Sequence, residues 1–148
     1  MPSKEIHKEL AQAIEDNEPA RVMKLLRFHP ELAEPAGWTP PPLHCASLWD
    51  RPTIASLFLD AGANIERLDP DSQTTPLRYA VMYCKPEMIR LFHSFGANCG
   101  PILEGGTTAY QLAGECREGK YEDYEDLPAK ETYQPIVALL EELGAATP

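Results

Sequence analysis

The first two helices that the pattern predicts cover residues 4–17 and 19–28. In each segment, apolar residues recur three or four positions apart, which is the spacing of one helix face. These residues are Ile6, Leu10, Ala13, Ile14, Val22, Leu25 and Leu26. The polar residues between them predict that each helix turns its other face to solvent.

Two later segments, residues 42–64 and 76–98, have the same pattern at an offset of 34 residues. Both begin with proline and leucine, continue with an alanine and a leucine–phenylalanine pair, and end in Gly-Ala-Asn. The matched pairs are Pro42/Pro76, Leu43/Leu77, Ala46/Ala80, Leu57/Leu91, Phe58/Phe92 and Gly62/Gly96. A fixed period of this size indicates a stacked array of repeats, in which each repeat buries its apolar face against its neighbours.

The repeated residues also predict where the helices begin and end. Proline suits the first turn of a helix, where its missing N–H would have no partner, so Pro52 and Pro86 predict the start of a second helix in each repeat. Gly62 and Gly96 can adopt the left-handed conformation that ends such a helix. Each repeat is therefore expected to be a pair of helices.

This pattern resembles the ankyrin-repeat family. Thr75-Pro76-Leu77 is similar to the motif that opens the first helix of those repeats, and Pro42-Leu43-His44 resembles it in part. The resemblance implies an all-α solenoid of helix–turn–helix units joined by hairpin-like loops, with residues 1–148 as a single domain. It implies four repeats, over about residues 4–36, 37–67, 68–100 and 101–146. It also implies that His44 ties neighbouring loops by hydrogen bonds.

Two segments depart from the family pattern. Thr39-Pro40-Pro41-Pro42 has three prolines in a row, which favour an extended lead into the next helix. The first-helix motif of the fourth repeat is recognisable at residues 106–113, but its closing Gly144 comes about 15 residues late. We place this insertion at about residues 118–132. It is long for a loop and is either functional, disordered or a helical extension.

The charge of the chain limits its partners. The formal net charge is −10, and the insertion contributes six acidic residues and two lysines. An acidic surface repels phosphate, which argues against nucleic acid and against an anionic membrane surface. A basic protein surface is the partner that such charge favours. The alternative is that the acidity only keeps the protein soluble.

Other sequence features favour a cytoplasmic protein. The N-terminal residues lack the apolar core of a signal peptide, and no segment approaches the ~20 apolar residues that span a bilayer. The four cysteines have no zinc-ligand spacing, so we expect reduced thiols. Cys45 is expected to fill the core. Polar residues of the first helix and acidic residues of the last one predict that both ends of the array are caps.

Contact positions follow from the resemblance. In ankyrin proteins, the partner tends to meet the hairpin-like loops and the two positions that follow the alanine pair of the first helix. Those helix positions here are Glu15, Asp16, Leu48, Trp49, Met82, Tyr83, Glu115 and Cys116, and the loop positions include Trp38 and Asp71. Four of the helix positions, Leu48, Trp49, Met82 and Tyr83, are large and apolar or aromatic, and they predict a contact centre within a charged rim. The alternative is that Leu48 and Trp49 pack inward.

Tyrosines among the carboxylates of the insertion form a second candidate contact. Tyr121, Tyr124 and Tyr133 could anchor a basic partner surface. The alternative is that the insertion is a solvated or disordered excursion. The predicted partner-binding residues are therefore Trp38, Leu48, Trp49, Asp71, Met82, Tyr83, Glu115, Tyr121 and Tyr124.

No motif in the sequence indicates catalysis, a cofactor or a metal. The chain lacks a nucleophile elbow, a glycine-rich phosphate loop and a His-x-x-x-His motif. We therefore predict a non-catalytic, monomeric module that binds a partner protein through its concave face. An acidic ankyrin-type inhibitor or immunity protein that blocks a basic enzyme or toxin is the alternative.

Overall fold

The computed structural model describes residues 3–35 and 37–145. These residues form α-helices and short 3-10 helices, and no β-strand occurs among them. The predicted all-α fold class is therefore confirmed. The chain divides into two compact units, residues 1–76 and 77–148. Within the described residues, no helix has the length and hydrophobicity needed to span a membrane.

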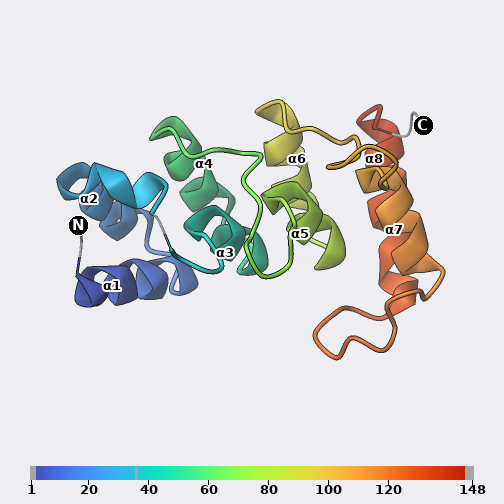
Figure 1. Cartoon of the computed structure of the whole chain (residues 1–148), viewed down its shortest axis with the longest axis horizontal. Coiled ribbons are helices and arrows are strands. Elements are labelled where there is room, and N and C mark those ends of the chain that lie inside the picture. Colours follow the sequence, from blue (N-terminus) through green and yellow to red (C-terminus); the bar gives the residue numbers. More distant parts are fainter. Residues whose placement is uncertain (1–2, 36, 146–148) are drawn as a thin grey trace. The chain divides into compact units, whose positions relative to one another are not determined.

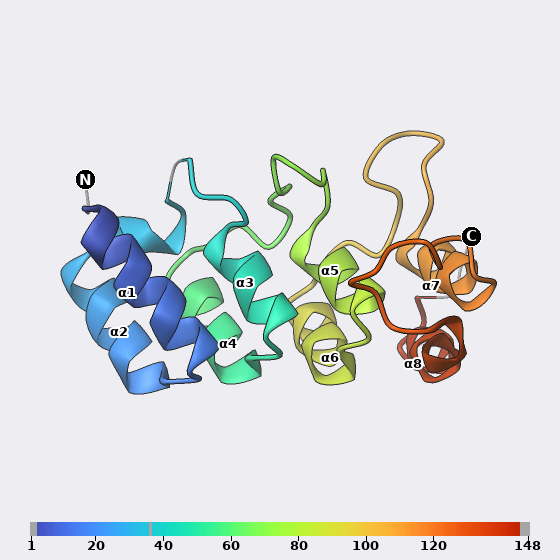
Figure 2. The same ribbon diagram turned by 90° about the horizontal axis from the view of Figure 1, so that it is seen from below.

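The first unit consists of two helix pairs that stack on each other (Figure 1). Its elements are α1 (Lys4–Glu15), α2 (Pro19–Phe28), the 3-10 helix η1 (Pro30–Ala33), α3 (Pro42–Leu48) and α4 (Pro52–Asp60). Helix α1 packs on α2 and α3 packs on α4, while α1 also contacts α3 and α2 contacts α4. The loops after α2 and α4 project from the same side of the helices (Figure 2).

Apolar side chains at helical spacing fill the core of the first unit. Leu10, Ala13 and Ile14 are fully buried on α1, as the pattern predicted, while Ile6 is only half-buried. Their buried neighbours come from every other element of the unit. These are Val22, Leu25, Leu26, Leu32, Leu43, Ala46, Ile54, Ala55 and Phe58.

The second unit also contains two helix pairs (Figure 2). Its elements are α5 (Pro76–Met82), α6 (Pro86–Ser94), α7 (Ala109–Arg117), the 3-10 helix η2 (Lys130–Tyr133) and α8 (Gln134–Glu142). Helix α7 packs against α8 and against η2. It has nine residues, whereas α5 has seven. The two additional residues, Cys116 and Arg117, precede the segment that we assigned to the insertion, and the last residues of that segment lie in η2.

The turn between the two helices of each pair uses one left-handed residue. Asn17, Asp50 and Cys84 have φ of 55°, 58° and 55°, and Gly119 has φ of 88°. Asn and Asp tolerate this conformation better than most side chains do. In the first three pairs the second helix starts two residues after this turn residue, whereas in the fourth pair a long connection follows Gly119 before α8 begins.

Hydrogen bonds tie the two loops of the first unit together. The fully buried His44 lies with Nε2 2.6 Å from the Thr74 carbonyl oxygen. The Thr39 hydroxyl donates to Asp69 Oδ1 at 2.9 Å, and the Asn64 amide donates to Glu34 Oε1 at 2.7 Å. The predicted structural role of His44 is confirmed.

The buried His44 makes the stability of the first unit depend on pH. Burial lowers the pKa of His44 from its usual 6.5, although the Thr74 carbonyl opposes this shift. The unfolded chain therefore binds a proton first, and we expect stability to fall as pH drops below about 6.5, by at most about 1.4 kcal/mol per pH unit. Urea denaturation between pH 7.5 and 5, run at about half-unit steps, measures the slope. A His44→Gln variant with the same slope would contradict the assignment.

A left-handed glycine ends α6. Gly96 has φ of 85° and donates its N–H to the His93 carbonyl, and the Ala97 N–H bonds the Phe92 carbonyl. This pair of bonds is the Schellman motif, which satisfies the last carbonyls of a helix. The prediction that Gly96 would take the left-handed conformation is confirmed.

Two alanine substitutions in the second unit should have opposite effects. Gly96 and Gly114 both have open space where a Cβ would stand, but only Gly96 has a positive φ. We expect Gly96→Ala to destabilise by about 1–2 kcal/mol, because an L-residue is strained there. Gly114→Ala, inside α7, should stabilise by about 0.5–1 kcal/mol. Chemical denaturation of both variants tests this, and a destabilisation of equal size at both positions would contradict it.

Candidate functional site

The nine predicted contact residues are divided between the two units. Four lie in the first unit, and five lie in the second. The first-unit residues are Trp38, Leu48, Trp49 and Asp71, and the second-unit residues are Met82, Tyr83, Glu115, Tyr121 and Tyr124.

In the first unit, the two tryptophans lie at opposite ends of α3. Trp38 precedes the helix, and its ring contacts the His7 ring with 5.2 Å between the centroids. Trp49 follows the helix as its C-cap residue, and its side chain is 42% exposed. Leu48 is half-buried. Leu48 and Trp49 are thus neighbours at the end of α3, and Trp38 lies before its start, as the assignment of Trp38 to a loop implied.

Asp71 is exposed in the loop after α4. Its carboxylate accepts a hydrogen bond of 3.4 Å from the Thr39 hydroxyl, which also bonds Asp69. Asp71 is thus part of the network that joins the two loops. Because its side chain remains exposed, it can still contribute charge to that surface.

In the second unit, the insertion returns from the end of α7 to α5 (Figure 2). Its first contact is with Glu115 on α7. The Tyr121 hydroxyl donates to Glu115 Oε2 at 3.0 Å, and Lys120 Nζ lies 3.1 Å from Glu115 Oε1. The Lys120 ammonium also lies 5.6 Å from the centroid of the Tyr121 ring. Two side chains of the insertion therefore occupy both oxygens of Glu115.

The other end of the insertion is anchored by Tyr133. This ring is buried, and its hydroxyl donates to the backbone carbonyl of Met82 at the end of α5. Burial raises the pKa of the Tyr133 hydroxyl, and the neighbouring thiols of Cys116 and Cys84 add to the rise. We had expected Tyr133 to be an outward contact. That prediction is wrong, because the ring is part of the core.

Two pairs of tyrosine rings lie along this side of the second unit. Tyr79 and Tyr83 pack edge to face with 5.8 Å between ring centroids, and Tyr121 and Tyr124 do so with 5.9 Å. Tyr83 and Tyr121 are half-buried, and Tyr124 is 62% exposed. Such rings offer apolar area with a polar edge, which suits a protein contact.

Electrostatic effects indicate that the insertion lies close to α5. Burial raises the pKa of Tyr83, and the charge of Asp126 adds to the rise. Burial lowers the pKa of Arg78 on α5, while the proximity of Tyr121 and Glu115 opposes this change. Asp126 and Tyr121 both belong to the insertion, so this segment lies close to α5 at two places.

Both lysines of the insertion form ion pairs with carboxylates of the second unit, whereas several of its acids form none with the described residues. Lys130 pairs with Glu122 at 2.8 Å, and Lys120 pairs with Glu115. Asp123, Glu125 and Asp126 are exposed, and none of them has an ion pair among the described residues. We call these three acids, together with Tyr83, Tyr121 and Tyr124, the tyrosine surface.

Cys116 does not face outward as we had expected. Its side chain is 3% exposed, because α7 continues for two residues more than α5 and keeps Cys116 on the buried face, one turn after Leu112. Burial raises the pKa of the Cys116 thiol to about 11, and it does the same for Cys84. These thiols are therefore protonated at neutral pH.

Cys45 was expected to fill the core, but it is only half-buried. Its thiol donates a weak hydrogen bond to the Pro40 carbonyl at 3.5 Å. Pro41, the N-cap residue of α3, is extended with ψ of 157°, as the three prolines predicted. A small apolar cavity of about 260 Å³ lies between this segment and the beginning of α1.

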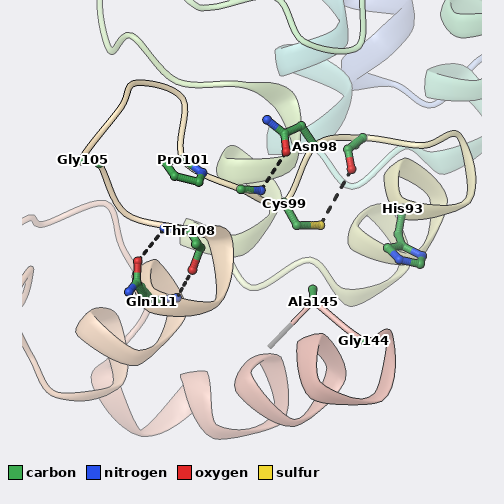
Figure 3. Close-up of a pocket in the computed structure, with 12 residues that line it drawn as sticks. His93, Asn98, Cys99, Pro101, Gly105, Thr108, Gln111, Gly144 and Ala145 are labelled. Atoms are coloured by element: carbon green, nitrogen blue, oxygen red, sulfur yellow. Dashed lines mark hydrogen bonds between the residues drawn. The ribbon is translucent and has the colours of Figure 1, made fainter. Parts of the chain in front are cut away.

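A larger cavity of about 630 Å³ lies beside the loop that precedes α7 (Figure 3). Its polar groups hold the loop and the helix in place. Thr108 Oγ1 accepts from the Gln111 amide at 3.0 Å, Gln111 Oε1 accepts from the Thr108 amide at 2.8 Å, and the Gly100 amide donates to Asn98 Oδ1 at 2.9 Å. The first two bonds form a capping box, which starts α7 without a proline.

Potential metal ligands do not gather in the described part of the chain, where no three His, Cys, Asp or Glu side chains come together in a suitable arrangement. The carboxylates of the insertion therefore stand as a charged surface rather than as a ligand set.

Sequence comparison places the repeats in a known family. Residues 43–93 match the family model described as "Ankyrin repeats (many copies)". This segment covers most of both copies of the pattern that recurs at 34 residues, namely residues 43–64 and 76–93. A search of curated proteins found no match to the chain.

Proposed function

Because this chain is an ankyrin-repeat protein, and such repeats generally mediate protein–protein interaction, we propose that it binds a partner protein that has a basic surface. The family is typically non-catalytic, and we propose that this chain is too. The contact would lie on the tyrosine surface of the second unit. Its partner would be a folded protein or a segment rich in lysine and arginine.

The observation that best supports this proposal is the path of the insertion. An acidic segment of this length could extend into solvent, yet it folds back and is held by Tyr121 on Glu115 and by Tyr133 on Met82. Aromatic rings and unpaired acids are thereby presented together. Aromatic side chains dominate the energy of many interfaces, and surrounding charge selects the partner and speeds association.

Two of the nine predicted contact residues, Glu115 and Met82, are not proposed as direct contacts. Glu115 and the Met82 backbone bind the insertion, so they position the surface. In the first unit, the exposed Trp49 is the residue that best fits a separate contact. It is tested apart from the tyrosine surface.

Affinity capture from the source cell tests the proposal. The baits are the wild-type protein, a Tyr83→Ala/Tyr124→Ala variant and a Phe28→Ala control, since Phe28 is 67% exposed on α2. We expect the wild type and the control to retain the same protein, and the double variant to retain at most about a tenth as much. Equal retention by all three baits would exclude the tyrosine surface, and a Trp49→Ala bait would then test the first unit.

The captured protein also distinguishes a general binding protein from an inhibitor. A basic enzyme whose activity falls in a one-to-one complex would identify the chain as its inhibitor. Retained activity in the complex would identify a binding role without inhibition.

We further propose a monomer in the cytoplasm. The four cysteines, Cys45, Cys84, Cys99 and Cys116, are free, which suits a reducing compartment. Sedimentation equilibrium of the purified protein measures the oligomeric state, and a concentration-dependent dimer would contradict this part of the proposal.

A further inference from the structure

The six tyrosines of the chain differ sharply in how accessible their hydroxyls are. The Tyr133 hydroxyl is buried on the Met82 carbonyl, the Tyr121 hydroxyl is bonded to Glu115, and the Tyr110 hydroxyl is bonded to Glu141 at 2.8 Å. Tyr79 and Tyr83 are half-buried and pack against each other. Each of these five is restrained by its surroundings.

Of the six tyrosines, all of which lie in the described residues, only Tyr124 is exposed, although its ring packs against that of Tyr121. The Tyr124 side chain is 62% exposed, and its hydroxyl makes no hydrogen bond to any of the residues that the structure describes. It lies in a turn of the insertion, where the Tyr124 amide donates to the Tyr121 carbonyl and the Leu127 amide donates to the Tyr124 carbonyl. An exposed turn of this kind can reach into the active site of another protein more easily than a helix can.

The residues beside Tyr124 are all acidic. Glu122 and Asp123 precede it, and Glu125 and Asp126 follow it. All four side chains are exposed, and within the described part of the chain only Glu122 has an ion-pair partner, Lys130. A phosphorylating enzyme with a basic substrate groove would attract this segment electrostatically, and the same charge would select against enzymes with acidic grooves.

We propose that Tyr124 is a phosphorylation site for an acid-directed tyrosine kinase. The Tyr124 hydroxyl oxygen attacks the terminal phosphorus of ATP. The bond from that phosphorus to the bridging oxygen of ADP breaks, and the phenolic proton passes to a base of the kinase. The products are phosphotyrosine and ADP. This site does not depend on the proposed binding function.

The phosphate would change how the insertion is held. It adds a charge of about −2 to a turn that already has four carboxylates. Both lysines of the insertion already have carboxylate partners, so the new charge is not neutralised without breaking one of those pairs. Repulsion should loosen the turn between Tyr121 and Leu127, where Tyr124 packs against the Tyr121 ring.

Phosphorylation of the full-length folded protein tests the site. The protein is incubated with ATP and an acid-directed tyrosine kinase, and the modified residue is located by peptide mass spectrometry. A synthetic peptide of residues 118–132 serves as the positive control for the kinase. We expect one phosphoryl group, on Tyr124, in both. Amide hydrogen exchange over residues 121–127 should then be on the order of tenfold faster than in the unmodified protein.

Two conservative variants separate this site from its neighbour. Tyr124→Phe keeps the ring contact but has no acceptor, so it should take no phosphoryl group. Tyr121→Phe loses the bond to Glu115 but keeps the Tyr124 hydroxyl, so it should still be modified. A phosphoryl group on Tyr121 would overturn the proposed site. So would a folded protein that takes up no phosphoryl group, whether or not the peptide is modified. Unchanged hydrogen exchange after modification would overturn the proposed loosening.

Discussion

Replacing Tyr133 with alanine is expected to lower the free energy of unfolding by about 3–5 kcal/mol, the usual cost of deleting a buried aromatic ring. The ring is 2% exposed, and its hydroxyl bonds the Met82 carbonyl, so the change removes both packing and a hydrogen bond. Tyr133→Phe keeps the ring and should cost about 1–2 kcal/mol, because the carbonyl loses its partner. Urea denaturation followed by circular dichroism measures both values.

Tyr124→Ala is the matched control, because that tyrosine belongs to the same segment and is 62% exposed. We expect its free energy of unfolding to lie within about 0.5 kcal/mol of wild type. If Tyr133→Ala were as stable as this control, the insertion would not be anchored on α5 in solution.

Neutralising three unpaired acids of the insertion is expected to slow association with the partner about tenfold or more at low salt. The variant is Asp123→Asn/Glu125→Gln/Asp126→Asn, which removes three exposed charges and keeps the shape of each side chain. The difference in association rate between this variant and the wild type should decrease as salt is added, because screening weakens the attraction in the wild type. Stopped-flow or surface plasmon resonance with the purified partner measures the association rate.

A second triple variant controls for net charge. Glu5→Gln/Asp60→Asn/Glu87→Gln removes the same number of exposed charges from positions outside the insertion. We expect it to associate nearly as fast as wild type. If the association rates of both triple variants fall equally, the overall charge of the protein rather than the insertion attracts the partner.

The helices were predictable because their signals are local. Pro52 and Pro86 begin α4 and α6 as expected, and Gly96 ends α6 in the left-handed conformation. Each of these residues has a backbone preference that does not depend on distant contacts. A repeated pattern then reinforces the prediction, since every repeat buries the same apolar face against its neighbours.

The path of the insertion could not be predicted, because it depends on contacts between residues far apart in the chain. Tyr133 bonds a carbonyl 51 residues earlier. Nothing in the local sequence distinguishes this tyrosine from Tyr121 or Tyr124, apart from its position just before the apolar residues of α8. That position could have indicated a buried ring.

Offsets failed where the length of a helix changed. Cys116 was assigned outward by counting from the third repeat, but the two additional residues of α7 keep it on the buried face. Glu115 was assigned to a partner, yet Tyr121 and Lys120 hold both its oxygens.

Site-specific photocrosslinking most directly tests whether the partner meets the tyrosine surface. The photoreactive residue p-benzoylphenylalanine is placed at position 124 in one protein and at position 28 in another, because both positions have exposed aromatic side chains. Each protein is irradiated with the captured partner. A covalent adduct from position 124 and none from position 28 is the predicted result. An adduct from position 28 alone, or equal adducts from both, would contradict the proposed binding surface.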